Sequence, residues 1–171
     1  CGDVYSFLGA ASSLEILSSS AADTDIDVTL YGLDGSYDSA SATVTTDGTD
    51  GTTPVAITGT YLRVHRAKVT SGTPAGNLTI RVASGGATVA QILLGNNQTL
   101  MAVYTVPLGY TGLLTSYYAS AEKSKDATVS LFVRPFGQVF QLKHRISVFQ
   151  SKADHVFDTP FTVGEKSDID L

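Results

Sequence analysis

Apolar and polar side chains alternate at every second position along most of the chain, whereas no segment shows the three- and four-residue spacing of an amphipathic helix. From 26 to 30, Ile, Val and Leu alternate with Asp and Thr, and a turn signal, Gly-Leu-Asp-Gly, follows at 32–35. From 39 to 45, Ala and Val alternate with Ser and Thr. The pattern predicts a β-hairpin whose outer face is rich in hydroxyl groups.

The segment YLRVHRAKV, residues 61–69, begins with the same alternation and then loses its phase. Leu62 and Val64 lie on one predicted face, but Arg66 stands where the next apolar residue is expected. A β-bulge near His65 and Arg66 restores the phase, so we predict one there.

Further strands are predicted where short apolar runs end at Gly, Pro or Asn. These segments are 78–82, 89–94, 129–133 and 139–148, and a surface loop without apolar residues is predicted at 46–54.

Residues 99–120, TLMAVYTVPLGYTGLLTSYYAS, contain no charged side chain. Pro107 and Gly109 predict a tight turn that joins two paired strands, and they argue against a lipid-spanning helix, which would lose backbone hydrogen bonds there. Tyr117 and Tyr118 are neighbours in a predicted strand, so they must point to opposite faces. We expect one to fill the core and the other to be covered by a partner subunit.

About ten short strands with turn residues between them are typical of an antiparallel sandwich. The predicted fold class is therefore all-β, an antiparallel β-sandwich of the jelly-roll or a related Greek-key type. The predicted organisation is an N-terminal arm at 1–13, a single domain at 14–163 and an acidic tail at 164–171. Residues 72–77 are predicted to be either a long loop of this domain or a joint within it.

Amino-acid composition says more about which partners the protein can bind than about which reaction it could catalyse. Charged residues make up only 16% of the 171 residues, below the roughly 25% of an average soluble domain. The formal net charge of −5 argues against nucleic acid as a partner, because nucleic-acid binding rests on a positive surface. Cys1 is the single cysteine, so a disulfide within the chain is excluded. No membrane partner is expected, and the alternative is a lipid attached to Cys1.

Motifs for catalysis are missing from the sequence. There is no Gly-x-Ser-x-Gly elbow and no phosphate-binding glycine loop, so we expect no enzyme activity and no cofactor. An enzyme whose residues converge only in the fold remains a minor alternative.

Metal-binding patterns are weak as well. His65, His144 and His155 are scattered and do not have the spacing of zinc ligands. Two clusters of carboxylates could bind calcium, which is the alternative interpretation. The simpler interpretation is that these carboxylates are solvated, so no bound metal is expected. The clusters are Asp23, Asp25 and Asp27, and Asp47 and Asp50.

Two basic segments stand out in this charge-poor chain, Arg63–Lys68 and Lys143–Arg145. They either protect exposed sheet edges or pair with carboxylates of a neighbouring subunit. Together with the two tyrosines they give the candidate interface, for which the residues are Arg63, His65, Arg66, Tyr117, Tyr118, Lys143 and Arg145.

Four segments of the chain resemble small β-rich proteins of tailed bacteriophages, especially marine ones. They are VTLYGLDGSYDSASATVTTDG (28–48), TYLRVHRAKVTSG (60–72), QTLMAVYTVPLGYTGLLTSYYAS (98–120) and LFVRPFGQVFQLKHR (131–145).

The resemblance implies a virion component without enzyme activity, most simply a capsid decoration or cement protein. It implies location in the virion and contacts with other virion proteins such as the major capsid protein. The low charge and the uncharged strand surfaces favour a homo-oligomer, for which a trimer is the expectation because closed rings are common. A neck or tail component is one alternative. A carbohydrate-binding β-sandwich for host attachment is the other.

Overall fold

The computed structural model describes residues 5–149 and 152–171, so Cys1 and the start of the predicted arm lie outside the described residues. Within the described residues the chain forms β-strands joined by turns and loops, and all the strand ladders are antiparallel. The predicted all-β, sandwich-like class is confirmed. No helix in this part of the chain is long and apolar enough to cross a membrane.

The chain forms two compact units, residues 1–101 and 102–171. They differ in charge, because 1–101 contains nine carboxylates and four Lys or Arg side chains, whereas 102–171 contains seven of each. The division differs from the single domain predicted at 14–163, and its boundary follows Met101. Each unit is described separately below.

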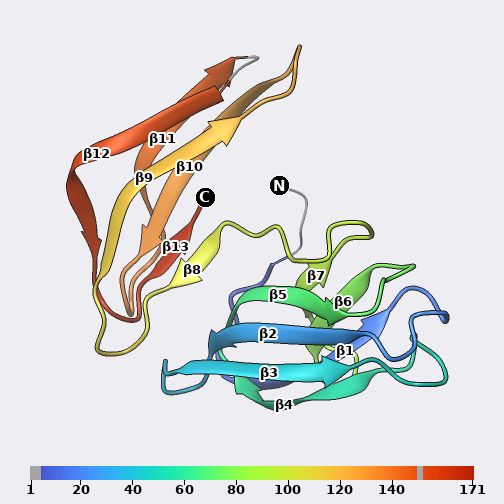
Figure 1. Cartoon of the computed structure of the whole chain (residues 1–171). Helices are drawn as coiled ribbons and strands as arrows, with labels where there is room; N and C mark the ends of the chain where they lie inside the picture. Colours follow the sequence, from blue (N-terminus) through green and yellow to red (C-terminus); the bar gives the residue numbers. More distant parts are fainter. Residues whose placement is uncertain (1–4, 150–151) are drawn as a thin grey trace. The chain divides into compact units, whose positions relative to one another are not determined.

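The N-terminal unit consists of two antiparallel sheets (Figure 1). The first has the order β4-β1-β6-β7, with β1 at Ser12–Ser18, β4 at Val55–Tyr61, β6 at Leu78–Val82 and β7 at Thr88–Ile92. The second has the order β3-β2-β5, with β2 at Asp27–Leu33, β3 at Ser39–Thr45 and β5 at Arg63–Ser71.

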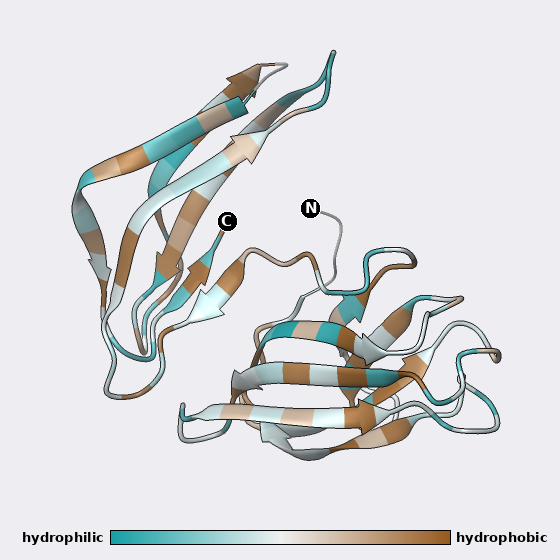
Figure 2. Ribbon diagram, viewed as in Figure 1, coloured by the Kyte–Doolittle hydropathy of each residue, from teal (hydrophilic) through white to brown (hydrophobic). Residues whose placement is uncertain are grey.

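Both sheets contribute to one hydrophobic core. Leu14 and Ile16 of β1 and Val28 and Leu30 of β2 are completely buried, and they belong to one cluster that draws on all seven strands. Apolar and hydrophilic colours alternate along these strands in Figure 2, as expected where one face is buried and the other is solvated. The N-terminal unit is therefore a small β-sandwich.

The predicted hairpin and bulge are both confirmed in this unit. β2 and β3 pair in unbroken register from Asp27 opposite Thr45 to Leu33 opposite Ser39. Between β2 and β5, Tyr31 lies opposite Arg66 while Gly32 lies opposite Val64, so His65 is the extra residue of a bulge.

The predicted joint near 72–77 is part of the N-terminal unit. The backbone N–H groups of Ala75 and Gly76 donate to the buried Asp23 carboxylate at 2.6 and 2.9 Å, and the Ser18 hydroxyl donates to the same carboxylate at 2.5 Å. These bonds tie 75–76 to the loop that follows β1, so this segment is an internal loop and not a linker.

Glu15 ties β1 to β6 and to the turn that follows β6. Its Oε1 accepts hydrogen bonds from Arg81 Nε at 2.7 Å and from the Gly85 N–H at 3.1 Å, and its Oε2 accepts one from the Ser84 N–H at 3.1 Å. Burial alone raises the pKa of Glu15, but the hydrogen bonds from Arg81, Gly85 and Ser84 outweigh it, so that pKa is lowered overall.

Glu15→Gln is expected to lower the free energy of unfolding at pH 7 by about 2 kcal/mol, since it removes a charged acceptor of three hydrogen bonds. Because the pKa is lowered in the fold, the carboxylate stabilises the protein above its unfolded pKa, and this stabilisation is lost as pH falls through the folded value. Urea unfolding at pH 7 and pH 3 should therefore show a smaller difference between variant and parent at pH 3. The exposed Glu122→Gln is the control, and an equal difference at both pH values would contradict the prediction.

The C-terminal unit also contains two antiparallel sheets. One has the order β11-β10-β13-β8, with β8 at Val103–Thr105, β10 at Asp126–Arg134, β11 at Gln141–Phe149 and β13 at Asp168–Asp170. The other pairs β9, Gly112–Ser120, with β12, Lys152–Val163. Its buried hydrophobic cluster consists of Val106, Val133 and Val163, with Phe161 and Ile169 packed against it.

The uncharged stretch 99–120 was predicted to form a hairpin, and this pairing is wrong. The turn exists, since the Tyr110 N–H donates to the Pro107 carbonyl at 3.2 Å. However, β8 pairs with β13, and β9 pairs with β12. Alternation and the turn residues identified the strands, but they do not determine which partner each strand takes.

The acidic tail predicted at 164–171 is also different in the structure. Residues 168–170 form β13, which lies between β8 and β10 and pairs with both. Asp168 is only 2% exposed. Its carboxylate accepts hydrogen bonds from Thr105 Oγ1 at 2.6 Å and from Arg134 Nε at 2.7 Å, and these bonds explain why a charged segment is ordered and buried.

Candidate functional site

The predicted interface residues fall into both units. In the N-terminal unit, Arg63 is buried, and its Nη1 donates to the carbonyls of Leu8 and Leu62 at 2.8 Å each. Its guanidinium also lies 5.3 Å from the centre of the Phe7 ring. Arg63 therefore holds the segment before β1 against β5 within the same unit.

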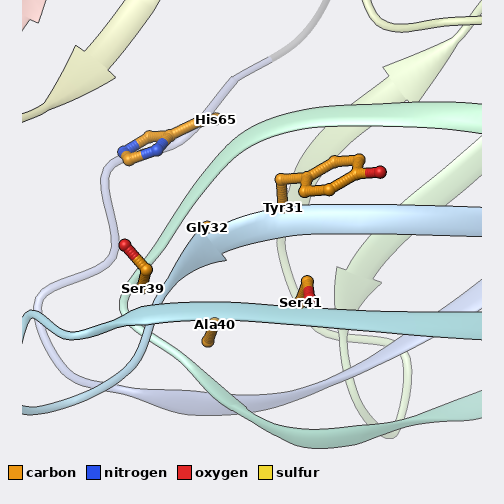
Figure 3. Close-up of a pocket in the computed structure, with 6 residues that line it drawn as sticks. All are labelled: Tyr31, Gly32, Ser39, Ala40, Ser41 and His65. Atoms are coloured by element: carbon orange, nitrogen blue, oxygen red, sulfur yellow. The ribbon is translucent and has the colours of Figure 1, made fainter.

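His65 and Arg66 lie at the bulge of β5 and have different surroundings. His65 is half-buried and lines a surface pocket of about 220 Å³ (Figure 3). Arg66 is exposed and lies opposite Tyr31 of β2. The pocket lining is completed by residues of β2 and β3, which are Tyr31, Gly32, Ser39, Ala40 and Ser41.

Tyr117 and Tyr118 point to opposite faces of β9, as predicted. Tyr117 is 8% exposed and Tyr118 is 83% exposed. The Tyr117 hydroxyl forms a hydrogen bond with His144 Nδ1, and burial raises the pKa of this hydroxyl. The His144 ring stacks on the His155 ring at 3.9 Å between centroids, so side chains from β9, β11 and β12 meet inside the C-terminal unit.

Exposed apolar side chains lie on the other side of the two-stranded sheet. We call this surface the outer β9–β12 face. Its exposed residues are Ser116, Tyr118, Asp154 and Val156 on one side of the register shift between Val156 and Phe161, and Leu113 and Thr162 on the other side. Leu113 is 63% exposed and Val156 is 65% exposed. These exposed apolar side chains make the face the candidate contact surface of the C-terminal unit.

The second basic segment lies on β11. Lys143 and Arg145 are exposed, and each donates a hydrogen bond to a neutral side chain. Lys143 Nζ donates to Gln141 Oε1 at 2.7 Å, and Arg145 Nε donates to Ser130 Oγ at 3.0 Å. Their charges are thus available to carboxylates of another molecule, which keeps the predicted interface role open.

Four of the five carboxylates considered for calcium, those of Asp23, Asp27, Asp47 and Asp50, accept hydrogen bonds from donors of the chain. Asp23 accepts the three bonds described above, and Asp27 Oδ1 accepts one from Thr45 Oγ1 at 2.6 Å. Asp47 and Asp50 accept bonds from Thr49 and Thr52 in their own loop, which lower the pKa of both groups. In residues 5–149 and 152–171, no three His, Cys, Asp or Glu side chains are grouped so as to hold a metal ion.

Comparison with protein-family models, with curated protein sequences and with solved structures finds no match.

Three residues of the outer β9–β12 face and of the pocket lining were not predicted from the sequence. Val156 lies diagonally across from Tyr118 and Leu113 lies further along β9, but the pairing of β9 with β12 that places Val156 there has no signal in the sequence. Tyr31 could have been found, because it follows Thr29 on the predicted hydroxyl-rich face of the hairpin.

Proposed function

We propose that this protein is a non-enzymatic structural protein of a bacteriophage virion, most simply a capsid decoration or cement protein. The observation that carries the proposal is the outer β9–β12 face, where Leu113, Tyr118 and Val156 are all more than half exposed. Burial of apolar surface is the main driving force of association, so such a face favours a protein that works by packing against others. The resemblance of the four quoted segments to phage proteins supports the virion as the setting.

Two further features support association through the C-terminal unit. Its buried cluster contains three valines, fewer than the fifteen buried residues in the core cluster of the N-terminal unit, so a partner can contribute much of its apolar burial.

The exposed charges of the C-terminal unit are also complementary. Strand β11 exposes Lys143 and Arg145, while β12 exposes Asp154 and Asp158, with Lys152 at its start. Contacts of β11 of one copy with β12 of the next give a closed ring where the rotation between copies closes, and a trimer is the expected size.

Assembly is tested with a pair of matched variants. Tyr118→Ser combined with Val156→Ser is expected to leave the folded chain monomeric, with at least a tenfold weaker association in analytical ultracentrifugation, because two exposed anchors are removed. Leu94→Ser, which changes an exposed leucine of the N-terminal unit, is the control and should associate as the parent does. A parent that stays monomeric at high concentration and does not bind washed phage heads would contradict the proposal.

Location in the particle is tested separately. Mass spectrometry of washed virions should detect the protein, and a particle reconstruction should place it on the head. Density at the neck or tail would favour the alternative virion role. Absence from washed virions would overturn the proposal.

A further inference from the structure

The outer surface of the β3-β2-β5 sheet carries a compact group of polar side chains around one tyrosine. The strand register places Tyr31 between Ser41 and Arg66, and it places Thr29 between Thr43 and Lys68. Residues two apart on a strand share a face, so the two rows lie next to each other on one surface. We call this surface the Tyr31 face, and its residues are Thr29, Tyr31, Ser41, Thr43, Arg66 and Lys68.

The Tyr31 face carries two of the four basic side chains of an otherwise acidic unit, the exposed Arg66 and the half-buried Lys68. In the described residues 5–101 there are four Lys or Arg side chains, and Arg63 is buried while Arg81 pairs with Glu15 at 2.7 Å. The other two are Arg66 and Lys68, both on this face. The nearest carboxylate along β2 is that of Asp27, two rows from Tyr31, and it is bound by the Thr45 hydroxyl.

Tyr31 provides an aromatic surface within this positive region. Its side chain is 37% exposed, and Lys68 Nζ lies 5.8 Å from the centre of its ring. An exposed tyrosine offers a rigid apolar ring and a polar hydroxyl, the combination that binds flat groups with one apolar face. On the same surface the Thr29 and Thr43 hydroxyls are 2.8 Å apart, so hydroxyl groups continue beside the ring.

The surface pocket borders Tyr31 and limits the size of what can bind. Figure 3 shows the lining residues on three strands, with Ser39 and Ser41 on β3, Tyr31 on β2 and His65 on β5. Its volume of about 220 Å³ is below the roughly 300–1,000 Å³ of pockets that enclose drug-sized ligands. One ring-sized group therefore fits, and a longer ligand has to continue over the face.

We propose that the Tyr31 face binds an anionic saccharide. One sugar ring packs with its apolar C–H surface on the Tyr31 ring, and its hydroxyl groups bond to Ser39 and Ser41. Its carboxylate, sulfate or phosphate group pairs with Arg66 and Lys68, since charge-assisted bonds are the strong polar contacts at such sites. This binding is independent of the proposed virion role and of the outer β9–β12 face.

The experiment measures binding of three polymers of equal length to the purified chain by isothermal titration calorimetry. Oligogalacturonate carries both sugar rings and carboxylates, dextran carries sugar rings alone, and polyglutamate carries carboxylates alone. Oligogalacturonate is expected to bind, more weakly as salt rises, and the other two should bind at least tenfold more weakly. A sulfated and a phosphorylated glycan then distinguish which anionic group is preferred.

Variants locate the site. Tyr31→Ala and Arg66→Ala are each expected to weaken oligogalacturonate binding at least tenfold, whereas Tyr31→Phe, which keeps the ring, should retain most of it. Tyr110→Ala and Lys125→Ala remove an exposed tyrosine and an exposed lysine of the C-terminal unit and should bind as the parent does. Urea midpoints confirm that each variant is folded.

Three results would overturn the proposal. They are polyglutamate binding as tightly as oligogalacturonate, no binding of any anionic glycan, and binding that Tyr31→Ala leaves unchanged. The first would show a charge effect without saccharide recognition, and the last would place binding elsewhere. Failure here leaves the virion proposal intact, because association and particle location are measured by other means.

Discussion

Asp168→Ala is expected to lower the free energy of unfolding by about 3 kcal/mol, because a buried ion pair loses one partner while Arg134 and the Thr105 hydroxyl lose their acceptor. Asp168 is almost fully buried, and Arg134 Nη2 lies 2.6 Å from its Oδ2. The arginine side chain is 26% exposed. Water can therefore solvate the remaining charge in part, so the expected loss is at the lower end of the range for buried pairs.

The measurement combines urea unfolding with hydrogen exchange. Amides of β8, β10 and β13 should lose protection first, because Asp168 anchors the short central strand β13 to both neighbours. Asp168→Asn keeps the shape of the side chain and should show a smaller loss. Asp158→Ala changes an exposed carboxylate of β12 and serves as the control. A loss below 1 kcal/mol with unchanged exchange would contradict the role given to Asp168.

Gly32→Ala is expected to destabilise the protein by about 3 kcal/mol, at the upper end of what overpacking costs. A Cβ at this position would lie 2.0 Å from the Arg63 carbonyl oxygen and 3.2 Å from the Val64 Cα. Both atoms are backbone, so the clash cannot be relieved by a side-chain rotation. The strand β5 would have to move away from β2 beside its bulge.

The thermal and urea midpoints measure this effect. Gly9→Ala is the matched control, because a Cβ there meets no heavy atom within 4 Å. If Gly32→Ala and Gly9→Ala unfold at the same midpoint, the close approach of β5 to Gly32 is not as described.

The strands were predictable because alternation is a local property. A strand with one buried face repeats every second residue, so β2, β3, β6 and β10 could be placed from short windows of sequence. Even the bulge in β5 was predictable, since one extra residue shifts the phase between Val64 and Ala67.

Pairing and burial of charge were not predictable, because they depend on residues far apart in the chain. The Asp168 carboxylate meets Arg134, and Arg63 meets the carbonyl of Leu8. A single sequence shows only a charged side chain in each case, and charged side chains are usually solvated. The same distinction applies to the candidate interface residues. The opposite directions of Tyr117 and Tyr118 follow from local alternation and were predictable, but the residues that each contacts were not.

The order β4-β1-β6-β7 has a consequence for synthesis on the ribosome. β1 lies inside its sheet and is synthesised before both of its partners, which are residues 55–61 and 78–82. Leu14 and Ile16 therefore stay exposed until most of the N-terminal unit has been synthesised. In contrast, β2 and β3 can pair as soon as their short turn is complete. Cotranslational folding should begin at the hairpin, and the nascent chain should bind chaperones through the first strand.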